Sequence, residues 1–278
     1  TPLLCRIYPN GIADVNHFHA AGGMTYLMTE LLAAGLLHSD VATMLGPDSL
    51  AEYTREPFLN DDSVVEWKDG PKQSLNTEIL RPVSDPFSPQ GGLNLLTGNL
   101  GRSVIKISAV KAEHHKITAP ALVFNSQNEF LDKFQKGELE RDFIAVLRFQ
   151  GPKANGMPEL HKLTPPLGVL QDKGFKVALV TDGRMSGASG KVPAAIHLTP
   201  EALDGGPIAK INDGDELCLN AAEGKLESAV SQADMDARII LAPDMADNNS
   251  GMGRELFTSL KSIVGSAETG ATFFNWDA

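Results

Sequence analysis

In the first ninety residues, one segment has strongly periodic apolar positions, and long polar stretches surround it. Residues 16–36 carry apolar side chains near helical spacing behind a polar start that contains glycine, and they predict a helix. A second short helix is expected at residues 48–53. Residues 68–92 contain four prolines and three glycines, a composition that predicts a linker or a long ordered crossover.

Beyond this segment, apolar runs and helical spacing alternate along the chain. Strands are predicted at 103–110, 119–124, 143–149, 175–181, 195–198, 216–220 and 238–241. Helices are predicted at 129–139, 160–173 and 253–264. This order indicates the α/β class, as a mixed β/α barrel or sandwich with flanking helices.

Charge and composition argue against some classes of protein. The net charge of −11, with no run rich in Lys or Arg, argues against a nucleic-acid-binding surface. No apolar stretch is long enough to span a membrane, and the N-terminus lacks signal-peptide features. The missing initiator Met suggests that the chain starts within something longer. Cys5 and Cys218 form no C-x-x-C motif, and we interpret them as free thiols in a reducing cytoplasm.

One turn carries an unusual density of reactive side chains. The β-branched run "VALVT" ends at Thr181 and opens into "DGRMSGASGK", which contains Asp182, Arg184, Ser186 and Lys191. Backbone N–H groups in such a glycine-rich turn can converge on an anion. Neither a Walker A loop, a G-x-S-x-G elbow nor a dinucleotide fingerprint fits its spacing. A plain surface turn after a core strand is the alternative.

Two further segments offer candidate site residues. "FQGPKANGMPE" (149–159) again follows a strand and ends in Glu159, which could equally be a favourable charge at a helix start. Both loops follow strands, so we expect them to converge at one edge of a sheet. In "NHFHAAGGM", His17 and His19 would point to different faces of a helix, so anion contact or capping is favoured over a shared metal.

From Thr181 onward, the block "LVTDGRMSGASGKVPAAIHLTPEALDGGPIAKINDGDELCL" resembles the dihydroxy-acid and phosphogluconate dehydratase family. "GPKANGMPE", "GGLNLLTGNLG" and "GMGRELF" extend the resemblance along nearly the whole chain. The segments "NHFHAAGGM" and "SGASGKVPAAIHLTPEALDGGPIAKI" are similar to the branch that acts on 6-phosphogluconate.

The resemblance implies the C-terminal half of a larger cytoplasmic enzyme, a homodimer of the Entner–Doudoroff pathway. Residues 1–75 would be the helical tail of its N-terminal domain, and residues 76–278 a swivelling β-barrel domain. The family uses an iron–sulfur cluster and Mg²⁺, but the cluster-binding cysteine motifs are absent from this chain. We therefore expect an isolated chain to be inactive.

The implied reaction removes water from 6-phospho-D-gluconate. The resemblance gives Glu159 the role of a Mg²⁺ ligand and Ser186 that of the base, with Thr181 and Asp182 positioning the loop. From their charge and placement we expect Arg184, Lys191, His17 and His19 to hold the phosphate. Two alternatives remain open: a family member acting on an unphosphorylated sugar acid or dihydroxy acid, and a non-catalytic dimerisation or lid module.

Overall fold

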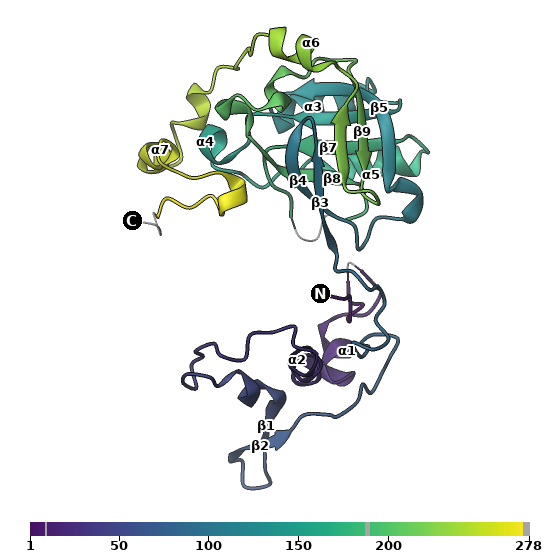
Figure 1. Ribbon diagram of the computed structural model, residues 1–278, viewed down its shortest axis with the longest axis vertical. Helices are drawn as coiled ribbons and strands as arrows, with labels where there is room; N and C mark the ends of the chain where they lie inside the picture. Colours follow the sequence, from purple (N-terminus) through teal and green to yellow (C-terminus); the bar gives the residue numbers. More distant parts are fainter. Residues whose placement is uncertain (9, 187–189, 275–278) are drawn as a thin grey trace. The chain divides into compact units, whose positions relative to one another are not determined.

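The computed structural model describes residues 1–8, 10–186 and 190–274, which divide into two compact units, Thr1–Gly92 and Leu93–Ala278. Figure 1 shows the course of the chain through each. Over these residues, no helix has both the length and the apolar character that crossing a bilayer requires.

The first unit is built on two short helices and a hairpin. The helices are α1 (Val15–Ala20) and α2 (Gly23–Ala33), and a 3-10 turn, η1 (Leu50–Thr54), leads into antiparallel strands β1 (Arg55–Leu59) and β2 (Val65–Asp69). Its small core consists of Phe18, Ala21, Tyr26 and Leu80. The single helix expected at 16–36 is interrupted, because Gly22 and Gly23 have φ values of 128° and 58° that end one helix before the next begins.

The second unit is a closed barrel of eight strands, in the order β10-β3-β4-β8-β7-β6-β5-β9. The strands are β3 (Leu93–Gly98), β4 (Gly101–Lys106), β5 (Lys116–Phe124), β6 (Phe143–Leu147), β7 (Val177–Thr181), β8 (Ala194–Thr199), β9 (Glu216–Asn220) and β10 (Lys225–Ser228). β5, β6, β7 and β8 run parallel to one another, whereas β4 and β9 pair antiparallel with both of their neighbours. The predicted α/β class with a mixed barrel is thus confirmed.

Helices flank this barrel, and the wall of the barrel separates two apolar cores. They are α3 (Gln127–Gln135), α4 (Pro152–Asn155), α5 (Thr164–Asp172), α6 (Gln232–Ala237) and α7 (Glu255–Lys261). Along β6, Ile144 and Val146 belong to the larger cluster, whereas Phe143, Ala145 and Leu147 join the cluster that also holds residues of α3 and α5. Alternate side chains of a strand point to opposite faces, so β6 is buried on both sides.

Two differences from the predicted elements have clear physical reasons. The strand expected at 238–241 does not form: Ile239 and Leu241 are exposed, and Arg238 instead pairs with Asp215. Strands β3 and β10 were not predicted, because polar residues, Asn94 in β3 and Glu227 in β10, interrupt the continuous apolar pattern of a buried strand.

Candidate functional site

Two loops meet at the carboxyl ends of β6 and β7. These strands are parallel neighbours, with Leu147 opposite Thr181 at their last paired position. Beyond the strands, Glu159 and Arg184 form an isolated β-bridge. Leu160 N donates to Arg184 O at 3.1 Å, and Arg184 Nε donates to Met157 O at 2.8 Å. The convergence expected from the sequence is confirmed.

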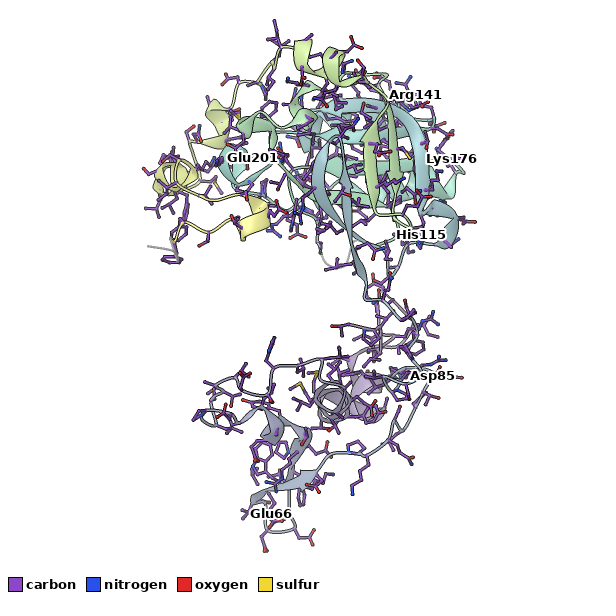
Figure 2. The ribbon with its side chains drawn as sticks, viewed as in Figure 1. Glu66, Asp85, His115, Arg141, Lys176 and Glu201 are labelled. Carbon is purple, nitrogen blue, oxygen red and sulfur yellow. The ribbon has the colours of Figure 1, made fainter. Side chains whose placement is uncertain are left out.

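Figure 2 helps to tell the two sides of the barrel apart. Arg141 and Lys176, which precede β6 and β7, lie at one side of the barrel. Glu201 lies toward the opposite side. The carboxyl edge of parallel strands is where ligands of open α/β sheets usually bind.

Asp182 anchors the turn that follows β7. Its carboxylate is fully buried and accepts hydrogen bonds from Gln150 N and Ala202 N, both at 2.9 Å. These donors belong to the loop after β6 and the segment after β8, so one side chain connects three parts of the chain. Burial raises the pKa of Asp182, and the backbone donors lower it by less. The neighbouring Thr181 hydroxyl is also buried and accepts from Gly183 N at 2.9 Å.

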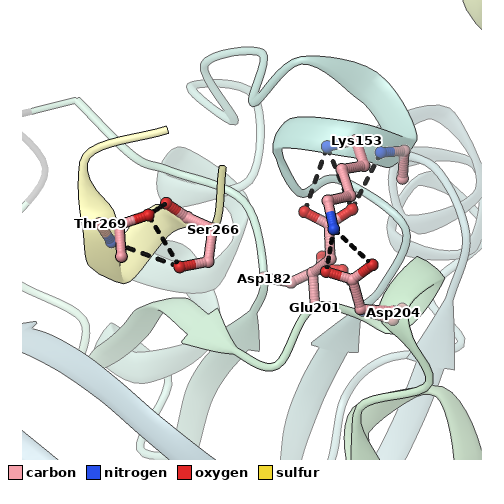
Figure 3. Close-up of polar contacts among 8 residues, drawn as sticks. Lys153, Asp182, Glu201, Asp204, Ser266 and Thr269 are labelled. Carbon is pink, nitrogen blue, oxygen red and sulfur yellow. Dashed lines mark hydrogen bonds and ion pairs between the residues drawn. The ribbon is translucent and has the colours of Figure 1, made fainter. Parts of the chain in front are cut away.

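Glu201 is a second buried carboxylate, and the sequence interpretation did not identify it. Its oxygens accept from Lys153 N at 3.1 and 3.2 Å and from Ala154 N at 3.0 Å, at the start of α4 (Figure 3). The Lys153 ammonium itself turns to Asp204, at 2.8 Å. Burial raises the pKa of Glu201, and the charges of Asp182 and Asp204 raise it further. This carboxylate therefore fixes the loop that leads to Glu159.

Glycine is required at position 183 because the neighbouring loop lies directly against the backbone. A Cβ atom there would lie 2.8 Å from Gln150 Cβ and 3.1 Å from Leu160 Cδ1. The turn after β7 therefore packs closely on the loop after β6, which brings Ser186 onto the same edge as Glu159. Ser186 is half-buried, two residues after the bridge formed by Arg184. The next residue, Gly187, lies outside the described residues.

His197 also belongs to this edge. A bulge breaks the β4–β8 ladder here, and His197 has a φ of 56°, in the left-handed region. Its N–H donates to Gly183 O at 2.9 Å. Burial lowers the pKa of the imidazole, and the positive charge of Arg184 lowers it further. No local sequence signal marks such a bulge, so only the fold reveals this residue.

Comparison with known proteins identifies the family of the chain. Residues 78–271 match the family described as dihydroxy-acid/6-phosphogluconate dehydratase C-terminal, and residues 1–52 match its N-terminal counterpart. The chain belongs to the dihydroxy-acid/6-phosphogluconate dehydratase family.

Several relatives in this family have assigned names. Over 98% of the chain, identity is 59% to the phosphogluconate dehydratase of Pseudomonas aeruginosa and 54% to that of Escherichia coli, covering 44% and 45% of those proteins. A dihydroxy-acid dehydratase of Sulfurisphaera tokodaii is 36% identical over 86% of the chain and 40% of its own length. The chain thus spans less than half the length of these curated relatives.

The other residues proposed for the phosphate lie in different surroundings from Arg184. Lys191 is exposed, its carbonyl accepts from Gln171 Nε2 at 3.2 Å, and it lines a hollow with Asp172 of α5. The residues described around Lys191, such as Gln171 and Asp172, differ from Met157, whose carbonyl Arg184 contacts. His17 and His19 belong to the first unit, where His17 Nδ1 lies 2.6 Å from Asp14 Oδ1.

The side chains of this chain differ in how well they could bind an iron–sulfur cluster and Mg²⁺. Its only two cysteines, Cys5 and Cys218, are both free and fall in different units. They do not fit an iron–sulfur cluster, which is usually held by four ligands. No group of three or more metal-ligating side chains occurs in the described part of the chain. Glu159, a half-buried carboxylate, fits Mg²⁺ as a single protein ligand, because Mg²⁺ often binds through one or two carboxylates and water.

Proposed function

We propose that this chain contributes the barrel and its loops to a hydro-lyase that converts 6-phospho-D-gluconate to 2-dehydro-3-deoxy-6-phosphogluconate and water. The observation that carries the proposal is the meeting of the Glu159 segment with the Asp182–Ser186 turn. The names of the relatives support the phosphorylated substrate, since those called phosphogluconate dehydratase are 52–59% identical and the dihydroxy-acid dehydratase 36%.

The reaction requires a base for the C2 proton, and Ser186 is the residue that we propose. A serine hydroxyl is a poor base unless nearby cations and backbone donors stabilise its alkoxide. Arg184, two residues earlier, supplies a cation to this turn and can bind an anionic group of the substrate. Asp182 and Thr181 act as positioning residues, because their oxygens are occupied by backbone N–H groups.

The proposed metal ligand is Glu159, whose carboxylate would bind Mg²⁺. When bound, Mg²⁺ would stabilise negative charge on the substrate carboxylate and C2 oxygen. The residues described here have no assigned part in the departure of the C3 hydroxide. That Lys191, His17 and His19 bind the phosphate of the substrate remains a prediction. A cytoplasmic homodimer likewise remains part of the proposal.

The test is Ser186→Ala in the complete natural protein that carries this sequence. We expect 2-keto acid formation from 6-phosphogluconate to fall at least about 100-fold, the usual contribution of a general base. Ser259→Ala, an exposed position on α7, is the matched control and should leave the rate unchanged. Retained turnover in Ser186→Ala with an unchanged circular dichroism spectrum would remove Ser186 as the base. Gluconate and a dihydroxy acid, assayed beside 6-phosphogluconate, separate the alternative substrates.

A further inference from the structure

A pocket of about 400 Å³ lies where α4 faces α7 and the following segment up to Phe273. Its walls are largely apolar and include Met157, Phe257 and Leu260. Two cationic residues also line it, Arg254 and Lys261. Arg254 belongs to the "GMGRELF" segment and Lys261 follows it at the end of α7, and the site described above uses neither residue.

In the described part of the chain the two cations lack a carboxylate at ion-pairing distance, although Arg254 and the exposed Glu255 attract each other. Neither Arg254 nor Lys261 forms an ion pair within the described ranges, although acids outnumber bases in the chain by 35 to 24. Glu255, next to Arg254, accepts from Gly251 N at 2.6 Å instead. Burial lowers the pKa of Lys261, and the positive charge of Arg254 lowers it further. Like charges facing one pocket repel each other, and a bound anion relieves that repulsion.

The donors of both side chains suit a phosphate group. Lys261 Nζ donates to Asn248 O at 2.7 Å and to Asn249 Oδ1 at 3.0 Å, which fixes the ammonium beside the pocket. Arg254 has five N–H donors, of which one bond is described, from Nη1 to Gly251 O at 3.2 Å. The guanidinium fork therefore has donors available for phosphate oxygens, and Lys261 adds a nearby point charge.

Met157 links the pocket to the proposed catalytic edge. This residue lines the pocket, and its carbonyl accepts from Arg184 Nε at 2.8 Å. Glu159 follows two residues later, a distance of at most about 7 Å along an extended chain. A short chain molecule with an anionic group at each end could therefore place one end beside Arg184 and the other in the pocket.

We propose that this pocket binds the phosphate monoester end of the sugar-acid substrate, with Arg254 as the fork and Lys261 as the supporting charge. The identity of the ligand rests on the proposed function. The assignment competes directly with the prediction that Lys191 holds the phosphate, because the described neighbours of Lys191 include none of the residues that line the pocket.

The test measures binding to the intact 278-residue chain by calorimetry and phosphorus NMR. The probes are 6-phosphogluconate, inorganic phosphate and gluconate. We expect the wild-type chain to bind both phosphorylated probes, more weakly as ionic strength rises, and gluconate at least tenfold more weakly than 6-phosphogluconate. Arg254→Gln and Lys261→Gln should each weaken 6-phosphogluconate binding about tenfold or more, in line with the loss of a charge-assisted hydrogen bond.

Two control variants make the result decisive. Arg141→Gln removes an exposed cation with no described ion pair and should bind 6-phosphogluconate as the wild type does. Lys191→Gln tests the competing ligand. The proposal is overturned if the wild-type chain binds no phosphorylated probe, if the two pocket variants bind like wild type, or if Lys191→Gln alone abolishes binding.

The same variants in the complete protein separate this proposal from the proposed function. We expect Arg254→Gln to raise KM for 6-phosphogluconate with little change in kcat. If the complete protein binds 6-phosphogluconate through the pocket without dehydrating it, the proposed function fails and the pocket assignment stands. If dehydration proceeds with an unchanged KM in Arg254→Gln, the pocket assignment fails alone.

Discussion

Replacing Asp182 by alanine should loosen the whole proposed catalytic edge, because this one carboxylate connects three segments. The substitution leaves Gln150 N and Ala202 N without acceptors in a buried environment. Each orphaned buried donor costs about 1–3 kcal/mol, which gives an upper range of about 2–6 kcal/mol for the pair. Removing a buried carboxylate also removes its desolvation penalty. We therefore expect the free energy of unfolding to fall by about 2–4 kcal/mol.

Asp182→Asn should cost about half as much, since the amide keeps one acceptor oxygen and turns its NH₂ toward the other donor. Urea unfolding followed by circular dichroism measures the global loss. Amide hydrogen exchange of Gln150 and Ala202 measures the local one. Asp132, exposed on α3, is the control, and its alanine variant should change stability by less than about 0.5 kcal/mol. An equal effect of the two alanine variants, or unchanged exchange at both amides, would refute the reasoning.

The pH dependence gives an independent check on the same residue. Burial raises the pKa of Asp182 in the folded chain above its value of about 3.9 in the unfolded chain. Between these two values the folded state holds a proton that the unfolded state lacks, so stability falls as the pH rises through that window. Asp182→Asn should remove this contribution and flatten the slope. A slope identical to that of the wild type would show that Asp182 is ionised in the folded chain throughout.

Two further predictions concern charges elsewhere in the barrel unit. Burial and the positive charge of Arg184 lower the pKa of His197. Arg184→Gln should therefore raise this pKa in an NMR titration of the ring protons, whereas Arg141→Gln should leave it unchanged. Equal pKa shifts in both variants would contradict the coupling between His197 and Arg184. Burial alone would raise the pKa of Asp215, but hydrogen bonds from Arg238 and Asn212 hold it below its usual range. Asp215→Asn should therefore cost about 1.5–3 kcal/mol at neutral pH, and this difference should fade in urea titrations as the pH falls through the lowered pKa. A loss that stays constant with pH would exclude the ion pair as its cause.

The sequence predicted the central strands and their meeting point because both follow from local pattern. β6 and β7 are buried on both faces, so each is a continuous apolar run that stands out from its surroundings. Loops at the carboxyl ends of parallel neighbours must lie side by side, and this brings Glu159 to Arg184. The conclusion required no knowledge of the remaining strands.

The sequence could not reveal residues whose role depends on partners far along the chain. Glu201 is one acidic residue among 35 Asp and Glu, and its partners, Lys153 N and Ala154 N, precede it by 48 and 47 positions. His197 is distinguished only by a backbone conformation at a bulge. Neither feature produces a periodicity or a spacing that could be recognised in advance.

The anchoring of this edge by backbone donors also explains how a cation stays available in an acidic chain. Arg184 is two residues from the buried carboxylate of Asp182, and opposite charges at short distance attract each other. Here both oxygens of Asp182 accept backbone N–H groups, and Arg184 uses only Nε, toward Met157 O, among the bonds described. Its remaining N–H groups are directed to no carboxylate in the described part of the chain. The protein thus stabilises the turn without neutralising the side chain that we propose to meet an anionic substrate.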